Sequence, residues 1–105
     1  MTETGMSANE ASAVVLLRHE NGLHARPSIK FNKLARTFAS RVEFGTAPAG
    51  PWVDAKSIVR VNAARVRQGS QLHIRATGAD ADAAVAALVA LVERDFDEAG
   101  ADAGG

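Results

Sequence analysis

The sequence of 105 residues contains no cysteine. Without cysteine the chain cannot form a disulfide scaffold, carry out thiol redox chemistry or build a Cys-based zinc site. The remaining candidate ligands, His19 and His73, stand apart from any cluster of acidic residues, and we interpret them as ordinary strand or loop histidines. We therefore expect no metal site and no bound cofactor.

An excess of charge of one sign is missing as well. Lys and Arg together number 12, Asp and Glu together number 12, and the aromatic residues are one tryptophan and four phenylalanines. A basic surface with interleaved aromatic residues, which is typical of nucleic-acid-binding domains, is not indicated. We expect no nucleic-acid partner, and salt-dependent binding to DNA or RNA would contradict that expectation.

Long hydrophobic runs are also absent from the sequence. The most apolar stretch, Ala83 to Val92, is far shorter than the roughly 20 residues that cross a bilayer as a helix. The first ten residues, MTETGMSANE, include no basic residue and no apolar core of the kind that marks a signal peptide. We expect a monomer in the cytoplasm with no membrane insertion.

The composition predicts one folded domain with a tail at each end. Hydrophobic residues make up 47% of the chain, which is enough for a compact core. Residues 1–10 are small and polar without any period, and residues 99–105 read AGADAGG, so both segments are predicted to be flexible. The folded domain is expected to span residues 11–98.

The hydrophobic pattern changes period several times within that domain. Alternating or continuous apolar residues predict strands at 13–18, 41–44, 52–53 and 71–76. Apolar residues at helical spacing predict helices that begin near Pro27, Ser57 and Asp80 or Asp82. The predicted stripes of the first and last helix are Phe31, Leu34, Ala35 and Phe38, and Val85, Leu88, Val89, Val92 and Phe96. This order, β-α-β-β-α-β-α, predicts an α+β fold with helices on one face of an antiparallel sheet.

The segment Asn21 to Ser28, NGLHARPS, places His24 just after a strand and just before a helix. The first N–H groups of a helix have no intrahelical partners, and they stabilise an anion at that point. Arg26 adds a permanent charge whose planar fork suits phosphate oxygens. Neutral imidazole is a nucleophile, so His24 could accept a phosphoryl group. A histidine at this position is also commonly a helix cap or a surface residue, and local physics leaves both interpretations open.

The string NGLHARP, Asn21 to Pro27, resembles the active-site signature of HPr, the histidine-containing phosphocarrier of the phosphoenolpyruvate-dependent phosphotransferase system. Asp54 to Ile58 resembles the regulatory-serine segment of that family, and Gln68-Gly69 with the strand that follows resembles its closing section. The resemblance covers about residues 12–97. It implies an open-faced β-sandwich of four antiparallel strands with three helices on one face.

The resemblance also implies a function. His24 would be the phosphoryl acceptor, through its Nδ1 atom, and Arg26 would stabilise the phosphoryl group. The donor would be phosphorylated Enzyme I, and the acceptor a protein of the Enzyme IIA type. The chain would be a stoichiometric carrier with a covalent phosphohistidine intermediate and not an enzyme.

Ser57 has two interpretations. The resemblance implies a regulatory phosphorylation site for HPr kinase/phosphorylase. The local pattern predicts an N-cap for the helix that follows, a role worth about 1 kcal/mol. A phosphate at a helix N-terminus is electrostatically tolerated, so the two roles are compatible.

The chain departs from the usual family pattern at Arg60 and Arg65, where typical members carry glycine. The loop between Phe44 and Trp52 is also about two residues longer. We expect Pro27, Ile58 and Arg60 to contact partner proteins, whereas Ile29 fits either a docking patch or the core. His24 and Arg26 favour the carrier, while the two added cations would change which partners dock and so leave an alternative open, a regulatory HPr-like module for nitrogen-related or catabolite control that carries little transport flux.

Overall fold

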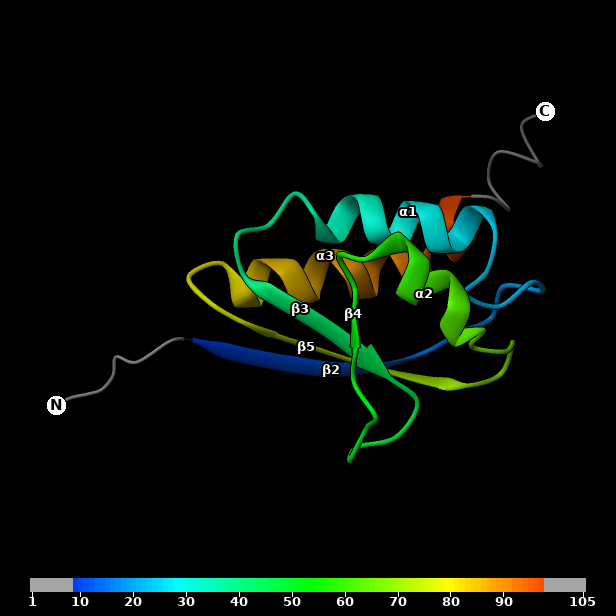
Figure 1. Ribbon diagram of the computed structural model, residues 1–105, viewed down its shortest axis with the longest axis horizontal. Helices are drawn as coiled ribbons and strands as arrows, with labels where there is room; N and C mark the ends of the chain where they lie inside the picture. The colour runs from blue at the N-terminus through cyan, green and yellow to red at the C-terminus, as the bar shows by residue number, and fades with distance from the viewer. Residues whose placement is uncertain (1–8, 98–105) are drawn as a thin grey trace, which may run out of the picture.

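The computed structural model describes residues 9–97. Within them it has four strands, three α-helices and one 3-10 helix, in the order predicted from the sequence (Figure 1). The strands are β2 (Glu10–Leu16), β3 (Arg41–Gly45), β4 (Val53–Asp54) and β5 (Gln71–Thr77). The helices are α1 (Arg26–Ala35), α2 (Ile58–Ala64), α3 (Ala81–Glu93) and the 3-10 helix η1 (Asp95–Asp97).

The domain begins slightly earlier than the sequence predicts. Glu10 was expected to belong to the N-terminal tail, but it is the first residue of β2 and pairs with Thr77. Before it, the carbonyl of Asn9 accepts a hydrogen bond from the N–H of Gly78. The polar residues of this strand misled the prediction, because they lie on the exposed face of the sheet. The rest of both predicted tails, 1–8 and 99–105, lies outside the described residues, as does residue 98, the last residue of the predicted domain.

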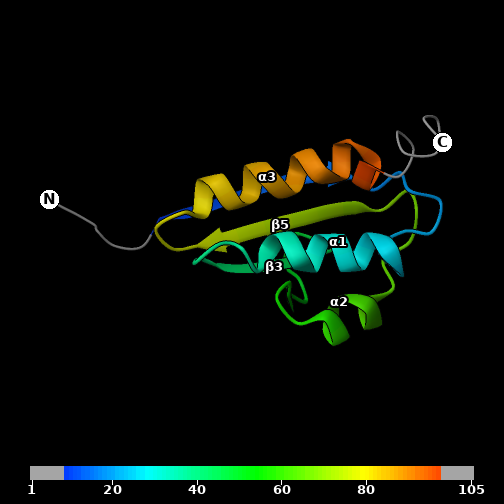
Figure 2. The same cartoon turned by 90° about the horizontal axis from the view of Figure 1, so that it is seen from above.

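The four strands form one antiparallel sheet in the order β2-β5-β3-β4. All three α-helices lie on one face of it, with α3 over β2 and β5, and with α1 between α3 and α2 (Figures 1 and 2). Within residues 9–97 the other face has no helix over it. This arrangement confirms the α+β, open-faced sandwich expected from the sequence.

The core lies between the sheet and the helices. Leu72, Ile74 and Ala76 of β5 are buried, as their alternation predicts, while the residues between them face the open side. The ring of Phe31 on α1 packs edge-on against that of Phe44 on β3, with centroids 5.5 Å apart. Phe31 and Phe44 are both completely buried, so this contact joins α1 firmly to the sheet.

On the face of the sheet opposite the helices, side chains pack around the long connection between β3 and β4. Trp52 was predicted to start a strand, but β4 begins one residue later, at Val53. The Trp52 ring instead lies 3.8 Å under the guanidinium carbon of Arg75, and Arg75 Nε donates to Glu43 Oε1 at 2.9 Å. Trp52 therefore packs against β5 from the end of the β3–β4 connection and does not belong to β4.

The C-terminal end of α3 differs from the prediction. Phe96 was expected on the helical stripe, but α3 ends at Glu93 and Phe96 belongs to η1. Positive φ angles at Asp95, Phe96 and Asp97 turn the chain back and bury Phe96, whose ring meets that of His19 edge-on at 5.9 Å. A tertiary contact has therefore overridden the helical period.

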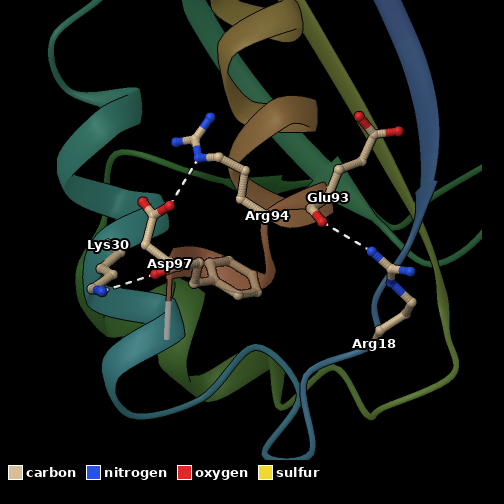
Figure 3. Close-up of polar contacts among 6 residues, drawn as sticks. Arg18, Lys30, Glu93, Arg94 and Asp97 are labelled. Carbon is tan, nitrogen blue, oxygen red and sulfur yellow. Dashed lines mark hydrogen bonds and ion pairs between the residues drawn. The ribbon is translucent and has the colours of Figure 1, made fainter. Parts of the chain in front are cut away.

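Two side chains from other segments bind this turn (Figure 3). Arg18 Nη2 donates to the carbonyl of Glu93 at 2.9 Å, and Lys30 Nζ of α1 donates to the carbonyl of Phe96 at 2.8 Å. Arg18 lies shortly before His24 in the chain and Lys30 shortly after it. The end of α3 thus holds the segments on both sides of the predicted phosphorylation site.

Candidate functional site

The turn before His24 is held tightly against the segment that follows α2. The N–H of Leu23 donates to the carbonyl of Val66 at 2.8 Å, and the two residues form an isolated antiparallel bridge. Gly22 has φ +64°, and a Cβ atom placed there would lie 2.1 Å from the same Val66 carbonyl oxygen. Only glycine fits this approach, because a side chain would overlap the backbone of the neighbouring segment.

His24 itself lies between that bridge and the first turn of α1, and it is partly buried. Its Nδ1 atom is buried and has no hydrogen-bond partner within residues 9–97. A buried polar atom without a partner is uncommon in folded proteins, and a catalytic role is one explanation for it. The geometry thus leaves Nδ1 uncommitted, although the atom is shielded from solvent in this conformation.

The chain enters α1 through an unusual backbone conformation at Ala25, with φ 56° and ψ −128°. Its carbonyl accepts hydrogen bonds from the Ile29 N–H at 3.1 Å and from Ser28 Oγ at 2.6 Å. Arg26 follows as the first helical residue and is exposed. The positive end of the helix and the guanidinium charge therefore lie directly after His24, where both stabilise an anion.

Asn62 of α2 completes the site, and sequence reasoning missed it. Its Oδ1 accepts a hydrogen bond from the Ala25 N–H at 3.2 Å and lies 3.3 Å from Ser28 Oγ. No local pattern singles out this residue, since it lies 37 positions after Ala25. Only a prediction that Leu23 pairs with Val66 could have pointed to Asn62, because this pairing brings α2 beside the site.

An apolar rim beside His24 consists of Ile29 on α1 and Ile58 and Val59 on α2. These side chains are exposed by 54%, 38% and 74%. They border a shallow groove between the two helices, whose lining includes Ala25, Ser28, Asn62, Ala63 and Arg65. Ile29 therefore belongs to the surface and not to the core, and the exposed position of Ile58 suits the docking role predicted for it.

Pro27 requires a correction. It was predicted to contact partner proteins, but its side chain is less than 2% exposed. Pro27 occupies the first turn of α1, where its missing N–H costs no helical hydrogen bond, and its ring packs inward. It therefore shapes the start of the helix and leaves the exposed apolar surface to its neighbour Ile29.

The start and end of α2 show how this chain uses Ser57 and its two unusual arginines. Ser57 is the N-cap, as predicted, and its Oγ accepts from the Arg60 N–H at 3.3 Å. Arg60 lies within the helix and is exposed. Arg65 is the C-cap in the left-handed region, with φ 48°, at the edge of the groove. Glycine is favoured at such a position, so arginine stays there at a cost in backbone energy.

Two further findings apply to residues 9–97. No three His, Cys, Asp or Glu side chains gather there in a way that could hold a metal ion. Of the helices in that range, none has the length and apolar content needed to cross a bilayer.

Comparisons with known proteins agree with this geometry. Residues 10–94 match the family model described as "PTS HPr component phosphorylation site". The phosphocarrier protein NPr of Proteus mirabilis is 36% identical over 84 residues, covering 80% of this chain and 92% of that protein. The phosphocarrier protein HPr of Pseudomonas aeruginosa is 39% identical over 77 residues, covering 73% and 84%.

A solved structure agrees with the sequence relatives. HPr-C-His from Thermoanaerobacter tengcongensis superposes with a TM-score of 0.77 at 33% identity, over 84% of this chain and 97% of that one. The match to the family model extends from β2 through α3 and includes the histidine turn, the first turn of α1 and the Ser57 segment. The chain belongs to the HPr family of phosphocarrier proteins.

Proposed function

We propose that this protein accepts a phosphoryl group on His24 from phosphorylated Enzyme I and passes it to a protein of the Enzyme IIA type. The observation that carries the proposal is the uncommitted Nδ1 atom of His24 at the start of α1. HPr-family membership supplies the class of reaction, and the position of His24 supplies the acceptor atom.

In the transfer step, the lone pair of the neutral His24 Nδ1 atom attacks the phosphorus of the donor phosphohistidine. The new N–P bond forms as the donor N–P bond breaks, and the departing electron pair stays on the donor imidazole. In the second step His24 is the donor: a nucleophile of the acceptor protein attacks the phosphorus, the His24 N–P bond breaks, and its electron pair stays on the His24 imidazole. The chain returns unchanged only through its two partners, so it is a carrier with a covalent intermediate and not an enzyme.

The protein's contribution is positioning and charge stabilisation. Arg26 and the N-terminal end of α1 lie next to His24 in the chain, and both stabilise the negative phosphoryl oxygens. Because Nδ1 is buried in the resting conformation, the His24 ring must turn about its Cβ–Cγ bond, or its cover must be displaced, before the donor reaches it.

Partners dock on the apolar rim of Ile29, Ile58 and Val59, with Arg60 and Arg65 beside it. Apolar contact supplies affinity, and the exposed arginines favour partners with carboxylates at the matching positions. Docking is therefore expected to weaken as salt rises. The carrier is proposed to act as a monomer in the cytoplasm, where its partners meet it.

Ser57 is proposed as a second phosphorylation site, for HPr kinase/phosphorylase. Its hydroxyl lies at the start of α2 next to Ile58 of the rim, so a phosphate there would place negative charge within the docking surface. Incubation with that kinase and ATP should label wild type and leave Ser57→Ala unlabelled. Equal labelling of the two proteins would contradict the proposal.

A regulatory module with little transport flux is the second candidate. Arg60 and Arg65 favour it, because they add positive charge to the surface that partner proteins are proposed to recognise. The NPr and HPr relatives are 36% and 39% identical to this chain, values that do not separate the two roles.

A relay experiment tests the proposal. Phosphoenolpyruvate labelled with ³²P, Enzyme I and the protein are incubated, and an Enzyme IIA protein is then added. The carrier is expected to gain label and lose it to the acceptor within the assay, and His24→Ala should gain none. Labelling without onward transfer to any Enzyme IIA protein would favour the regulatory module. Absence of label on wild type would contradict both candidates.

A further inference from the structure

We infer that Asn62 is a positioning residue that reports the phosphorylation state of His24 to α2. It holds the N–H of Ala25 while His24 is unphosphorylated and releases that N–H to the phosphoryl group when His24 is loaded. This inference rests on the proposed function and adds a mechanism by which partners distinguish loaded carrier from unloaded carrier.

The argument begins with the donors available to a phosphoryl group on His24. The first two residues after His24, Ala25 and Arg26, each have a main-chain N–H, whereas the next residue, Pro27, has none. In the unphosphorylated protein the Ala25 N–H is already engaged, since it donates to Asn62 Oδ1 at 3.2 Å. A phosphoryl group that uses this donor must displace Asn62.

The displacement is energetically favourable. The amide oxygen of asparagine is a neutral acceptor, whereas a phosphoryl oxygen carries charge, and charge-assisted hydrogen bonds are about twice as strong as neutral ones. The Ser28 hydroxyl holds Asn62 only weakly, because its single proton points to the nearer Ala25 carbonyl at 2.6 Å and Asn62 Oδ1 lies 3.3 Å away. The Ala25 N–H is thus the main donor to Asn62 Oδ1, and phosphorylation of His24 takes that donor away.

The consequence reaches the docking surface. Asn62 lies on α2 and lines the same groove as Ile58, Val59 and Arg65. Once its side chain is released, the polar surface of the groove changes beside the apolar rim. A partner that docks there would meet a different surface on the loaded carrier than on the unloaded one.

Two substitutions should shift the phosphorylation equilibrium in opposite directions. Asn62→Ala removes the bond from the unloaded state alone, so phosphohistidine should become favoured by about fivefold, the effect of one net hydrogen bond. Asn62→Asp keeps the acceptor and adds a charge beside the phosphoryl group, which should disfavour phosphohistidine by about tenfold. Mere loss of stability would not produce opposite shifts.

The measurement is a competition. Each variant is mixed with wild type, limiting phosphoenolpyruvate and Enzyme I, and intact mass at neutral pH gives the phosphorylated fraction of each protein. Ala63→Asp is the matched control, because Ala63 lines the same groove on the same helix while the Asn62–Ala25 bond is left in place. It should shift the equilibrium clearly less than Asn62→Asp does. Equal ratios for wild type and both Asn62 variants would overturn the inference.

A second readout needs no Enzyme I. Phosphoramidate can load histidine directly, as its P–N bond breaks and ammonia leaves. NMR of the loaded wild type should show large shifts of the Ala25 backbone N–H and of the Asn62 side-chain NH₂. If His24 is loaded but the Asn62 signals stay in place, the inference fails while the proposed function stands. If neither phosphoramidate nor Enzyme I with phosphoenolpyruvate places a phosphoryl group on His24, both fail.

Discussion

The N–H of Leu23 donates to the carbonyl of Val66 at 2.8 Å, and this bond joins the residue before His24 to the segment that follows α2. The contact brings two stretches of chain together at the point where Gly22 leaves no room for a side chain. The position of His24 therefore depends on a backbone pairing as well as on its own helix.

Gly22→Ala tests this pairing. The new Cβ would overlap the Val66 carbonyl oxygen in a left-handed backbone conformation, so the free energy of unfolding should fall by about 3 kcal/mol or more. Gly69→Ala is the matched control, since Gly69 also has positive φ but no heavy atom lies within 4 Å of its added Cβ. Its loss should be about 1 kcal/mol. Urea denaturation measures both, and equal losses would contradict the close approach.

Arg65 and Arg60 should respond oppositely to replacement by glycine. Arg65 is left-handed, so Arg65→Gly should stabilise the protein by about 0.5–1 kcal/mol. Arg60 lies inside α2, so Arg60→Gly should cost about 1 kcal/mol. Both variants should show weaker salt dependence of partner binding. Thermal or urea unfolding gives the stabilities, and destabilisation by Arg65→Gly would show that its backbone is unstrained.

Val59 tests the docking surface. Val59→Thr keeps the shape of the side chain but puts a hydroxyl into the proposed contact, so kcat/KM for phosphorylation by Enzyme I should fall about fivefold or more. Val14→Thr makes the same change on the open face of the sheet, where Val14 is also exposed. That control should be phosphorylated at the wild-type rate. Equal effects of the two variants would contradict the proposal that Enzyme I docks on the rim.

Asp80 gives a pH-dependent prediction. Hydrogen bonds from the Ser40 hydroxyl and then from the Ala39 N–H lower the pKa of Asp80 below its ordinary value of 3.8. A lowered pKa means that the ionised form stabilises the fold above pH 3.8, and that this contribution is lost as pH falls through the lowered value. Asp80→Ala should therefore be less stable than wild type at neutral pH, with a difference that shrinks in acid.

Denaturation of both proteins at a series of pH values measures that difference. Asp82→Ala serves as the control, because it removes a carboxylate from the same turn of α3 but leaves the bonds to Ser40 and Ala39 in place. A difference between wild type and Asp80→Ala that stays constant down to the lowest pH would contradict the assigned role.

The elements could be predicted from the sequence because their patterns are local. The alternation in Gln71–Thr77 and the helical spacing in Ala81–Glu93 each reflect one face turned to the core. Phe96 broke the pattern, since its burial comes from a reversed backbone and from contact with His19. No periodicity within the helix contains that information.

The candidate site divides in the same way. His24 and Arg26 could be found because they are adjacent in the chain and the start of a helix has a local signature. Asn62 could not, because its contact with Ala25 exists only after the chain folds. Pro27 was misjudged because its position in the sequence does not reveal which way its ring points.

The most direct test of this account is the chemical identity of the phosphorylated atom. The protein labelled with ¹⁵N at histidine is phosphorylated by phosphoenolpyruvate and Enzyme I, and ³¹P–¹⁵N coupling locates the bond. We predict one acid-labile phosphoryl group per chain, bound to Nδ1 of His24, and none in His24→Ala. A phosphoryl group on His19 or His73, or label that persists in His24→Ala, would contradict the account.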